Sequence, residues 1–248
     1  KGECYCCLGS SAWVACVDDS PLLDKEMRTF NLAGIQKGSV FPIGTMQAAG
    51  VSYNWMRDEL CQREQLEAER DGKDIYDCIN SQIAQVPFGA NGVIYLPYLL
   101  GERSPWWDDR AKGAFLGLQK STTHADMLRA VMEGISYNLA LNLAVLRQRH
   151  QFREIRVMGG CAKEVVWRQI LADMFGLPVQ KLSHLDEACS MGAAVVAGIG
   201  AGVFTDSGAV AKFVQTDGLS VPQPDAAEFY ENQLGRFAES YRRLQGLF

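Results

Sequence analysis

A strand, a glycine pair and a helix follow one another past the middle of the sequence, and this order constrains the fold more than any other feature. A short apolar run at residues 155–158 stops at Gly159-Gly160, and a helical pattern with apolar residues at every fourth position follows and ends at Gly176. Such a unit either brings bare backbone N–H groups and a helix N-terminus to an anion or a flat ligand, or is a plain strand-to-helix turn. The glycine pair alone does not decide between the two.

Short apolar runs and long helical patterns alternate along the rest of the chain. A hairpin is predicted over residues 3–17, and its bend, Gly9-Ser10-Ser11, is either an ordinary turn or a phosphate-facing loop. Further strands are predicted at residues 29–32, 40–43, 93–96 and 179–182, and helices at residues 47–70, 74–85, 123–149 and 188–201. This alternation predicts a layered α/β domain.

Two predicted helices carry informative residues near their beginnings. Gly50 lies early in the helix expected at residues 47–70, where glycine costs about 1 kcal/mol relative to alanine. Gly50 is therefore expected to mark the close approach of another backbone or of a ligand. A last amphipathic helix is expected to be capped by Asp225 together with Glu228.

The composition narrows the class of partner. The chain has 248 residues, of which 48% are hydrophobic and 21% are charged, and its net charge is −5. These values are ordinary for a globular protein with a large core, and they argue against nucleic acid or an anionic membrane as the main partner. The most apolar segment, residues 191–204, is too short to span a membrane. We expect a cytoplasmic protein.

Eight cysteines raise the question of a metal site or of disulfides. Cys4 and Cys7 have the CxxC spacing, but no second pair completes a zinc site, and His124, His150 and His184 show no ligand spacing. We therefore predict buried thiols in a reducing compartment and no metal-ligating residues. Because strand-like sequence begins at once without an initiator Met, we also expect the chain to be a piece of a longer protein.

Four segments stand in an order that resembles a known family. They are LGSSAW at residues 8–13, GVSYNWMRDEL at residues 50–60, YLLGERSPWWDDRAKGAFLGLQKSTTHADMLRAVMEGISYN at residues 98–138, and the glycine-pair segment with its downstream small-residue helix at residues 155–204. Together they resemble the C-terminal domain of the FGGY family of carbohydrate kinases. The GERSPWWD loop is more similar to xylulokinase- and gluconokinase-like members than to glycerol kinase.

The resemblance implies a fold, two cofactors and a set of site residues. The implied fold is the ribonuclease-H-like α/β fold of actin and Hsp70 ATPases, with a central mixed sheet flanked by helices, and residues 1–248 are its C-terminal nucleotide-binding domain. ATP and Mg²⁺ are the implied cofactors. Gly9, Ser10 and Ser11 match the family turn at the terminal phosphates, and Gly50 and Asn54 match positions beside the phosphates and the ribose. Gly159, Gly160 and Cys161 match the turn under the nucleoside. Glu164 matches a position near adenine.

Two of these positions depart from the family pattern, and one family residue is missing. Ser10 replaces the more usual threonine and keeps its hydroxyl, whereas Glu164 stands where serine or asparagine is common. The family's catalytic aspartate lies upstream of its LGTSG-type turn, which LGSSAW at residues 8–13 resembles. We therefore expect no catalytic residue in this chain, and we expect the N-terminal sugar-binding domain to lie outside it.

The function implied by the resemblance is transfer of the ATP γ-phosphate to a sugar hydroxyl, with ATP and the sugar as partners. A pentulose such as xylulose is the favoured acceptor, and gluconate or another sugar acid or polyol is the alternative. A non-catalytic nucleotide-sensing module of the actin-like fold is an alternative of another class, and an α/β scaffold without a nucleotide site is a third. A homodimer is left open.

Overall fold

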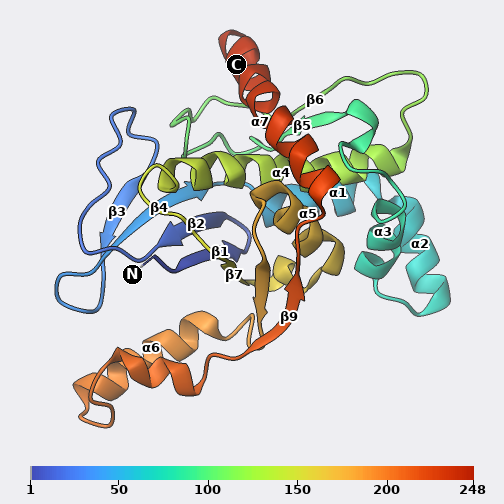
Figure 1. Cartoon of the computed structure of the whole chain (residues 1–248). Helices are drawn as coiled ribbons and strands as arrows, with labels where there is room; N and C mark the ends of the chain where they lie inside the picture. The colour runs from blue at the N-terminus through green and yellow to red at the C-terminus, as the bar shows by residue number, and fades with distance from the viewer. Residues whose placement is uncertain (1) are drawn as a thin grey trace.

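A central sheet of mixed direction forms the middle of the protein in the computed structural model, which describes residues 2–248 (Figure 1). Its strand order is β3-β4-β2-β1-β7-β8-β9, and β5 and β6 form a separate pair. The strands are β1 (Cys4–Leu8), β2 (Ala12–Cys16), β3 (Phe30–Ala33), β4 (Val40–Met46), β5 (Ile94–Leu96), β6 (Ala114–Leu116), β7 (Ile155–Met158), β8 (Val179–Leu182) and β9 (Thr216–Ser220). Strand β7 is parallel to β1 and to β8, and the other neighbours are antiparallel. The predicted mixed α/β architecture is confirmed.

Helices α4 and α5 pack against each other and against strands of the sheet, and α7 crosses over both (Figure 1). The helices are α1 (Gly50–Leu60), α2 (Gln62–Asp71), α3 (Ile75–Ile83), α4 (His124–Leu146), α5 (Val165–Phe175), α6 (Ala188–Gly200) and α7 (Pro224–Leu244). Short 3₁₀ turns are η1 (Ala90–Gly92), η2 (Gly160–Lys163), η3 (Ser207–Lys212) and η4 (Gln245–Leu247). The main apolar core therefore lies between the sheet and the layer of α4, α5 and α7.

Helix α4 is the centre of this core and is buried on almost every side. It begins with a capping box, in which Thr123 Oγ1 accepts from the Asp126 N–H and the Asp126 carboxylate accepts from the Thr123 N–H. Farther along, Arg129 Nε donates to Glu133 Oε1 at 2.6 Å, and the Tyr230 hydroxyl of α7 donates to the same oxygen at 2.7 Å. A buried carboxylate is tolerated here because it is paired, and the same bonds tie α7 to α4.

The single helix predicted at residues 47–70 is wrong, because the chain forms α1 and α2 with a break at Cys61. The backbone of Cys61 leaves helical geometry at φ −111° and ψ 33°, and its side chain is fully buried. The side chain of Gln62 then donates to the carbonyl oxygen of Glu59 at 2.7 Å, which satisfies an acceptor at the end of α1. Helical periodicity runs through this break, so the sequence pattern does not reveal it.

Three further details differ from the expectations. Strand β6 has three residues, and β9 is a polar edge strand without alternation, so neither has a strand signal. Helix α7 begins at Pro224 with no side-chain cap, and the predicted cap by Asp225 and Glu228 is wrong. Proline suits the first helical position because its missing N–H would have no partner there.

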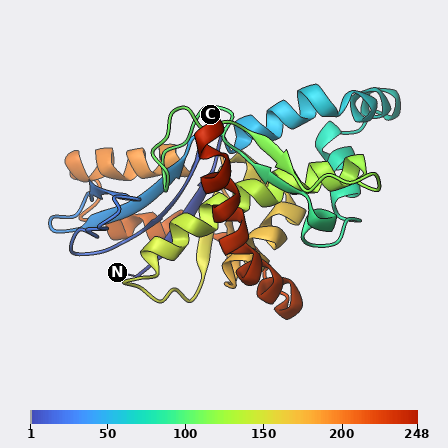
Figure 2. The same ribbon diagram turned by 90° about the horizontal axis from the view of Figure 1, so that it is seen from above.

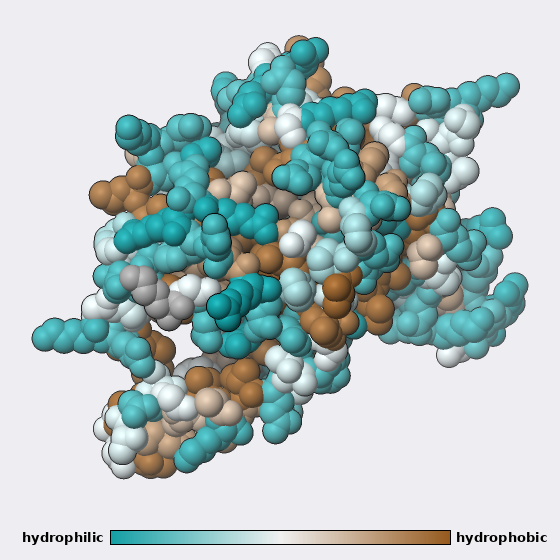
Figure 3. Space-filling model, viewed as in Figure 1, coloured by the Kyte–Doolittle hydropathy of each residue, from teal (hydrophilic) through white to brown (hydrophobic). Residues whose placement is uncertain are grey.

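Helix α6 and the turn η3 project from the sheet as an arm, named here the α6 arm (residues 188–213). Figure 2 shows this arm and the helices α1, α2 and α3 on opposite sides of the molecule. A cavity of about 930 Å³ separates the arm from the sheet, and Figure 3 shows apolar residues gathered on the arm. Across residues 2–248, none of the helices combines the length and the apolar character that crossing a bilayer requires.

Candidate functional site

A cleft of about 500 Å³ opens where the bend between β1 and β2, the start of α1, the start of α3 and the turn after β7 meet. Its lining residues are Leu8, Gly9, Ser10, Gly50, Tyr53, Asn54, Asp74, Tyr76, Gly160, Cys161, Lys163 and Glu164. The structure therefore brings together most of the residues that the sequence singled out. Ser11 is exposed on the bend but is not part of the lining, and Gly159 lies beneath the cleft without lining it.

The start of α1 is bonded directly to the β1–β2 bend. The Gly50 N–H donates to the Gly9 carbonyl at 3.0 Å, and the Val51 N–H donates to the Ser10 carbonyl at 3.1 Å. A Cβ atom at position 50 would lie 2.6 Å from the Gly9 oxygen, so only glycine fits. The close backbone approach expected at Gly50 is confirmed. Because these two helix N–H groups already have partners, an anion at this cleft would have to use other donors of the bend, such as the hydroxyl of Ser10.

The two glycines after β7 do different things. Gly159 has φ +91°, and a Cβ atom there would lie 2.5 Å from the carbonyl oxygen of Leu8 at the end of β1. This position therefore fixes the approach of the turn to the sheet. A Cβ atom on Gly160 would meet nothing closer than Asp186 Oδ1 at 3.8 Å, so Gly160 presents open backbone to the cleft.

One wall of the cleft is aromatic, and the sequence patterns did not predict it. Tyr53 of α1 and Tyr76 of α3 stack with ring centroids 5.3 Å apart and planes at 20°. The Tyr76 hydroxyl donates to Asn54 Oδ1 at 3.0 Å, which holds the predicted side chain of Asn54 against this wall. Tyr53 lies within the segment GVSYNW and could have been suspected as a neighbour of Gly50. No spacing rule links Tyr76 to it, because the two helices meet only in the folded chain.

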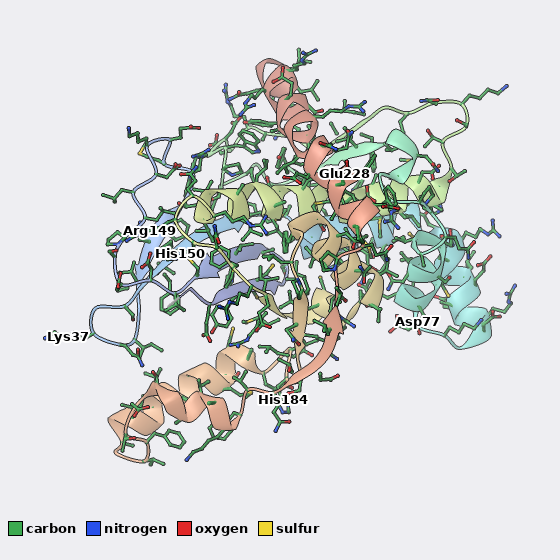
Figure 4. All side chains as sticks on the ribbon, in the orientation of Figure 1. Lys37, Asp77, Arg149, His150, His184 and Glu228 are labelled. Carbon is green, nitrogen blue, oxygen red and sulfur yellow. The ribbon has the colours of Figure 1, made fainter. Side chains whose placement is uncertain are left out.

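Most of the charged side chains that line the cleft are acidic, and one of them, Glu164, is partly buried. Burial, followed by the nearby carboxylates of Asp77 and Asp74, raises the pKa of Glu164, which also accepts a hydrogen bond from the Asn80 side chain. Figure 4 shows Asp77 on the lobe formed by α2 and α3. Burial also raises the pKa of Cys161 to about 12, so this residue is a neutral thiol near pH 7. A glutamate in this setting accepts a proton more readily than an exposed one.

The sequence profile described as "FGGY family of carbohydrate kinases, C-terminal domain" matches residues 4–201. The chain belongs to the FGGY family of carbohydrate kinases. Among curated FGGY-family relatives it is 32% identical over 246 residues to the xylulose kinase of Staphylococcus epidermidis, covering 98% of this chain and 47% of that protein. It is also 30% identical over 250 residues to the gluconokinase of Bacillus subtilis, covering 100% of this chain and 48% of that protein.

Solved structures of FGGY kinases confirm the fold. The crystal structure of a ligand-bound xylulose kinase from Lactobacillus acidophilus aligns with a TM-score of 0.86 at 26% identity, covering 98% of this chain and 48% of that one. The expected sugar-kinase fold of the actin and Hsp70 type is therefore confirmed. This chain spans about half the length of the curated relatives it matches.

Proposed function

We propose that residues 1–248 are the C-terminal nucleotide-binding domain of an ATP-dependent carbohydrate kinase, a phosphotransferase that moves the γ-phosphate of ATP to a sugar hydroxyl. The observation that carries this proposal is the cleft in which the β1–β2 bend, the start of α1 and the Gly160 turn converge. Its volume of about 500 Å³ falls within the range of about 300–1,000 Å³ typical of small-molecule sites. Family membership supports ATP as the occupant.

The lining residues suit the parts of a nucleotide. The open backbone at Gly160 and the thiol of Cys161 would lie under the nucleoside, with Glu164 as a hydrogen-bonding partner for the base. The bend at Gly9-Ser10-Ser11 would meet the terminal phosphates through the hydroxyl of Ser10, which lines the cleft. The stacked wall of Tyr53 and Tyr76 supplies a flat, mostly apolar surface beside these groups.

The charge balance of the cleft supports a metal-bound nucleotide. Among the residues that line it, Lys163 is the one cationic side chain, and its Nζ lies 2.5 Å from Asp186 Oδ2. The triphosphate charge would therefore meet little protein charge of opposite sign. Mg²⁺ bound to the phosphate oxygens would neutralise this charge in the transferred group. Phosphates and water would supply most of its ligands, and we propose that the acidic groups that help to hold it lie outside this chain.

In this proposal the chain contributes positioning. The bend and the Gly160 turn hold the donor phosphate in one orientation, and catalysis of phosphoryl transfer depends mostly on such positioning and on charge stabilisation. We propose that the sugar and the carboxylate that accepts its hydroxyl proton are held by residues outside this chain, which spans about half the length of its relatives. The cytoplasm is the proposed compartment, supported by the eight cysteines, all within the described residues and all unpaired.

A pentulose such as xylulose is the proposed acceptor, and gluconate or another sugar acid or polyol is the second candidate. The relatives at 32% and 30% identity are a xylulose kinase and a gluconokinase, so identity alone separates the two weakly. Expression from the complete reading frame followed by measurement of ATP consumption with D-xylulose and with D-gluconate tests the proposal. We expect turnover with one of them, xylulose first. ATP binding without turnover on any sugar would instead favour the non-catalytic nucleotide-sensing module.

A further inference from the structure

A second site lies at the break between α1 and α2, away from the cleft. Cys61 and Glu64 lie at the start of α2, and His124 is the first residue of α4. The ligating atoms of these three side chains all lie within 4.8 Å of one another. Thiol, carboxylate and imidazole are the three side-chain types that bind zinc in proteins.

Glu64 has an unusual environment for a surface helix. Its side chain is 2% exposed although it lies in the first turn of α2. Oε1 accepts a hydrogen bond from Gln82 Nε2 at 2.7 Å and lies 3.5 Å from His124 Nδ1. Oε2 is buried and has no hydrogen-bond partner. Leaving a buried carboxylate oxygen without a donor is unfavourable, so a cation beside Oε2 would satisfy an atom that the protein does not.

The space around these residues suits a metal with one open position. A cavity of about 470 Å³ lies beside Glu64 and His124, and the His124 side chain is 40% exposed to solvent, which provides an entry path. Cys61, by contrast, is fully buried. In a tetrahedral zinc site, ligand atoms stand about 3.3–3.8 Å apart, so side-chain movements of roughly 1 Å would close the present separations.

We propose that Cys61, Glu64 and His124 form a zinc site with water in the fourth position. The mixed sulfur, oxygen and nitrogen donors favour Zn²⁺ over Mg²⁺ or Ca²⁺, which prefer oxygen ligands alone. On binding, the Cys61 thiol releases its proton to solvent and the thiolate coordinates the ion. The sequence predicted no metal-ligating residues, since His124 stands far from Cys61 and Glu64 along the chain and only the fold brings them together.

The location of this site gives the ion a structural role. It would join the α1–α2 break to the start of α4 in the core. Helix α2 packs on α3, whose residue Tyr76 lines the nucleotide cleft. Zinc would therefore hold the lobe of α2 and α3, which carries Tyr76 of the aromatic wall, against the rest of the protein, and its binding would stabilise the folded state by mass action.

Competition with a chromophoric chelator, using metal-free protein and Zn²⁺ alone as the probe, tests the site. We expect one ion per chain and a loss of affinity in His124→Ala that exceeds the roughly 10–100-fold cost of removing an outer-shell partner. His124 is exposed, so this variant should fold. His184→Ala is the matched control, because His184 is also exposed and lies on the turn after β8 (Figure 4). Equal affinities of the wild type and His124→Ala would overturn the proposal.

Cobalt substitution tests the sulfur ligand separately. Co²⁺ should give a thiolate-to-metal charge-transfer band in the near ultraviolet, which Cys61→Ser removes and Cys189→Ser keeps. Cys189 is exposed and lies on the α6 arm, so it controls for adventitious thiol binding. A band that persists in Cys61→Ser, or no band in the wild type, would contradict coordination by Cys61.

Discussion

Helices α5 and α6 follow two adjacent parallel strands of one sheet, yet their environments are opposite. In α5, large side chains including Trp167, Leu171 and Phe175 are buried against α4 and α7. In α6, Val195 is the one buried residue, although the helix consists almost entirely of small and apolar residues. A Cβ atom added at Gly192 would meet no described atom within 4 Å. Both helices are apolar enough to be buried. The large side chains of α5 extend to the neighbouring helices, whereas most side chains of α6 are small.

The largest effect on stability is expected when an apolar side chain is shortened to alanine in each helix. Trp167 is fully buried, and its Nε1 donates to Ser136 Oγ at 3.1 Å. Trp167→Ala should lower the free energy of unfolding by about 3–5 kcal/mol, because it leaves a cavity and removes a buried hydrogen bond to Ser136. Val196→Ala on α6, where Val196 is 41% exposed, should change it by less than about 1 kcal/mol. Denaturant titration measures both, and similar losses would show that α6 is packed in solution.

A second test uses pH, because burial in the core raises the pKa of a carboxyl group, whereas exposure to solvent does not. Burial raises the pKa of Glu102 to about 8 from its ordinary value of 4.5, although the backbone N–H groups of Arg103 and Gln47 donate hydrogen bonds to its carboxylate. Between about pH 4.5 and pH 8, Glu102 therefore keeps its proton in the folded state and has released it in the unfolded state. The contribution of Glu102 to the free energy of unfolding should be largest below about pH 4.5. It should fall by on the order of a few kcal/mol as pH rises to about 8.

Glu102→Gln should flatten this part of the profile, because the amide cannot ionise. Glu228→Gln is the control, since Glu228 lies exposed on α7 (Figure 4). Chemical denaturation at a series of pH values measures the slope. An unchanged slope in Glu102→Gln would mean that the folded protein does not retain the proton on Glu102.

The smallest test compares two glycines. Gly176 ends α5 with φ +58°, so Gly176→Ala should cost about 1–2 kcal/mol. Gly192 lies within α6 with nothing near its Cβ position, so Gly192→Ala should be neutral or stabilising by up to about 1 kcal/mol. Thermal unfolding of both variants checks the expected difference in sign. Destabilisation by Gly192→Ala would indicate a close neighbour of α6 in solution.

Most of the fold was predictable from the sequence because its signals are local. The β1–β2 hairpin, the capping box at Thr123 and the end of α5 at Gly176 each depend on residues a few positions apart. The break at Cys61 was not predictable, because tertiary burial of that side chain overrides an unbroken helical pattern. The position of the α6 arm was not predictable either, since it depends on what the arm packs against.

The candidate site follows the same division. The glycines and Ser10 were identifiable because they stand in short runs of consecutive residues that resemble family motifs, although each turn alone left an ordinary turn as the alternative. Tyr76 was not identifiable, since it reaches the cleft from another helix and has no spacing relation to the glycine turns. Gly159 was expected at the nucleotide, and in the structure its nearest neighbour is the end of β1.

The most direct test of the central claim is the affinity for ATP, measured by calorimetric titration of the wild type, Gly160→Val and Gly235→Val. Gly160 lines the cleft, and a Cβ atom there meets no protein atom closer than 3.8 Å, whereas a Cβ atom at Gly235 on α7 meets nothing within 4 Å. We predict one ATP per chain for the wild type, at least roughly tenfold weaker binding for Gly160→Val, about 1.4 kcal/mol, and unchanged binding for Gly235→Val. No binding by the wild type, or equal binding by Gly160→Val, would contradict the assignment of the turn after β7 to the nucleotide.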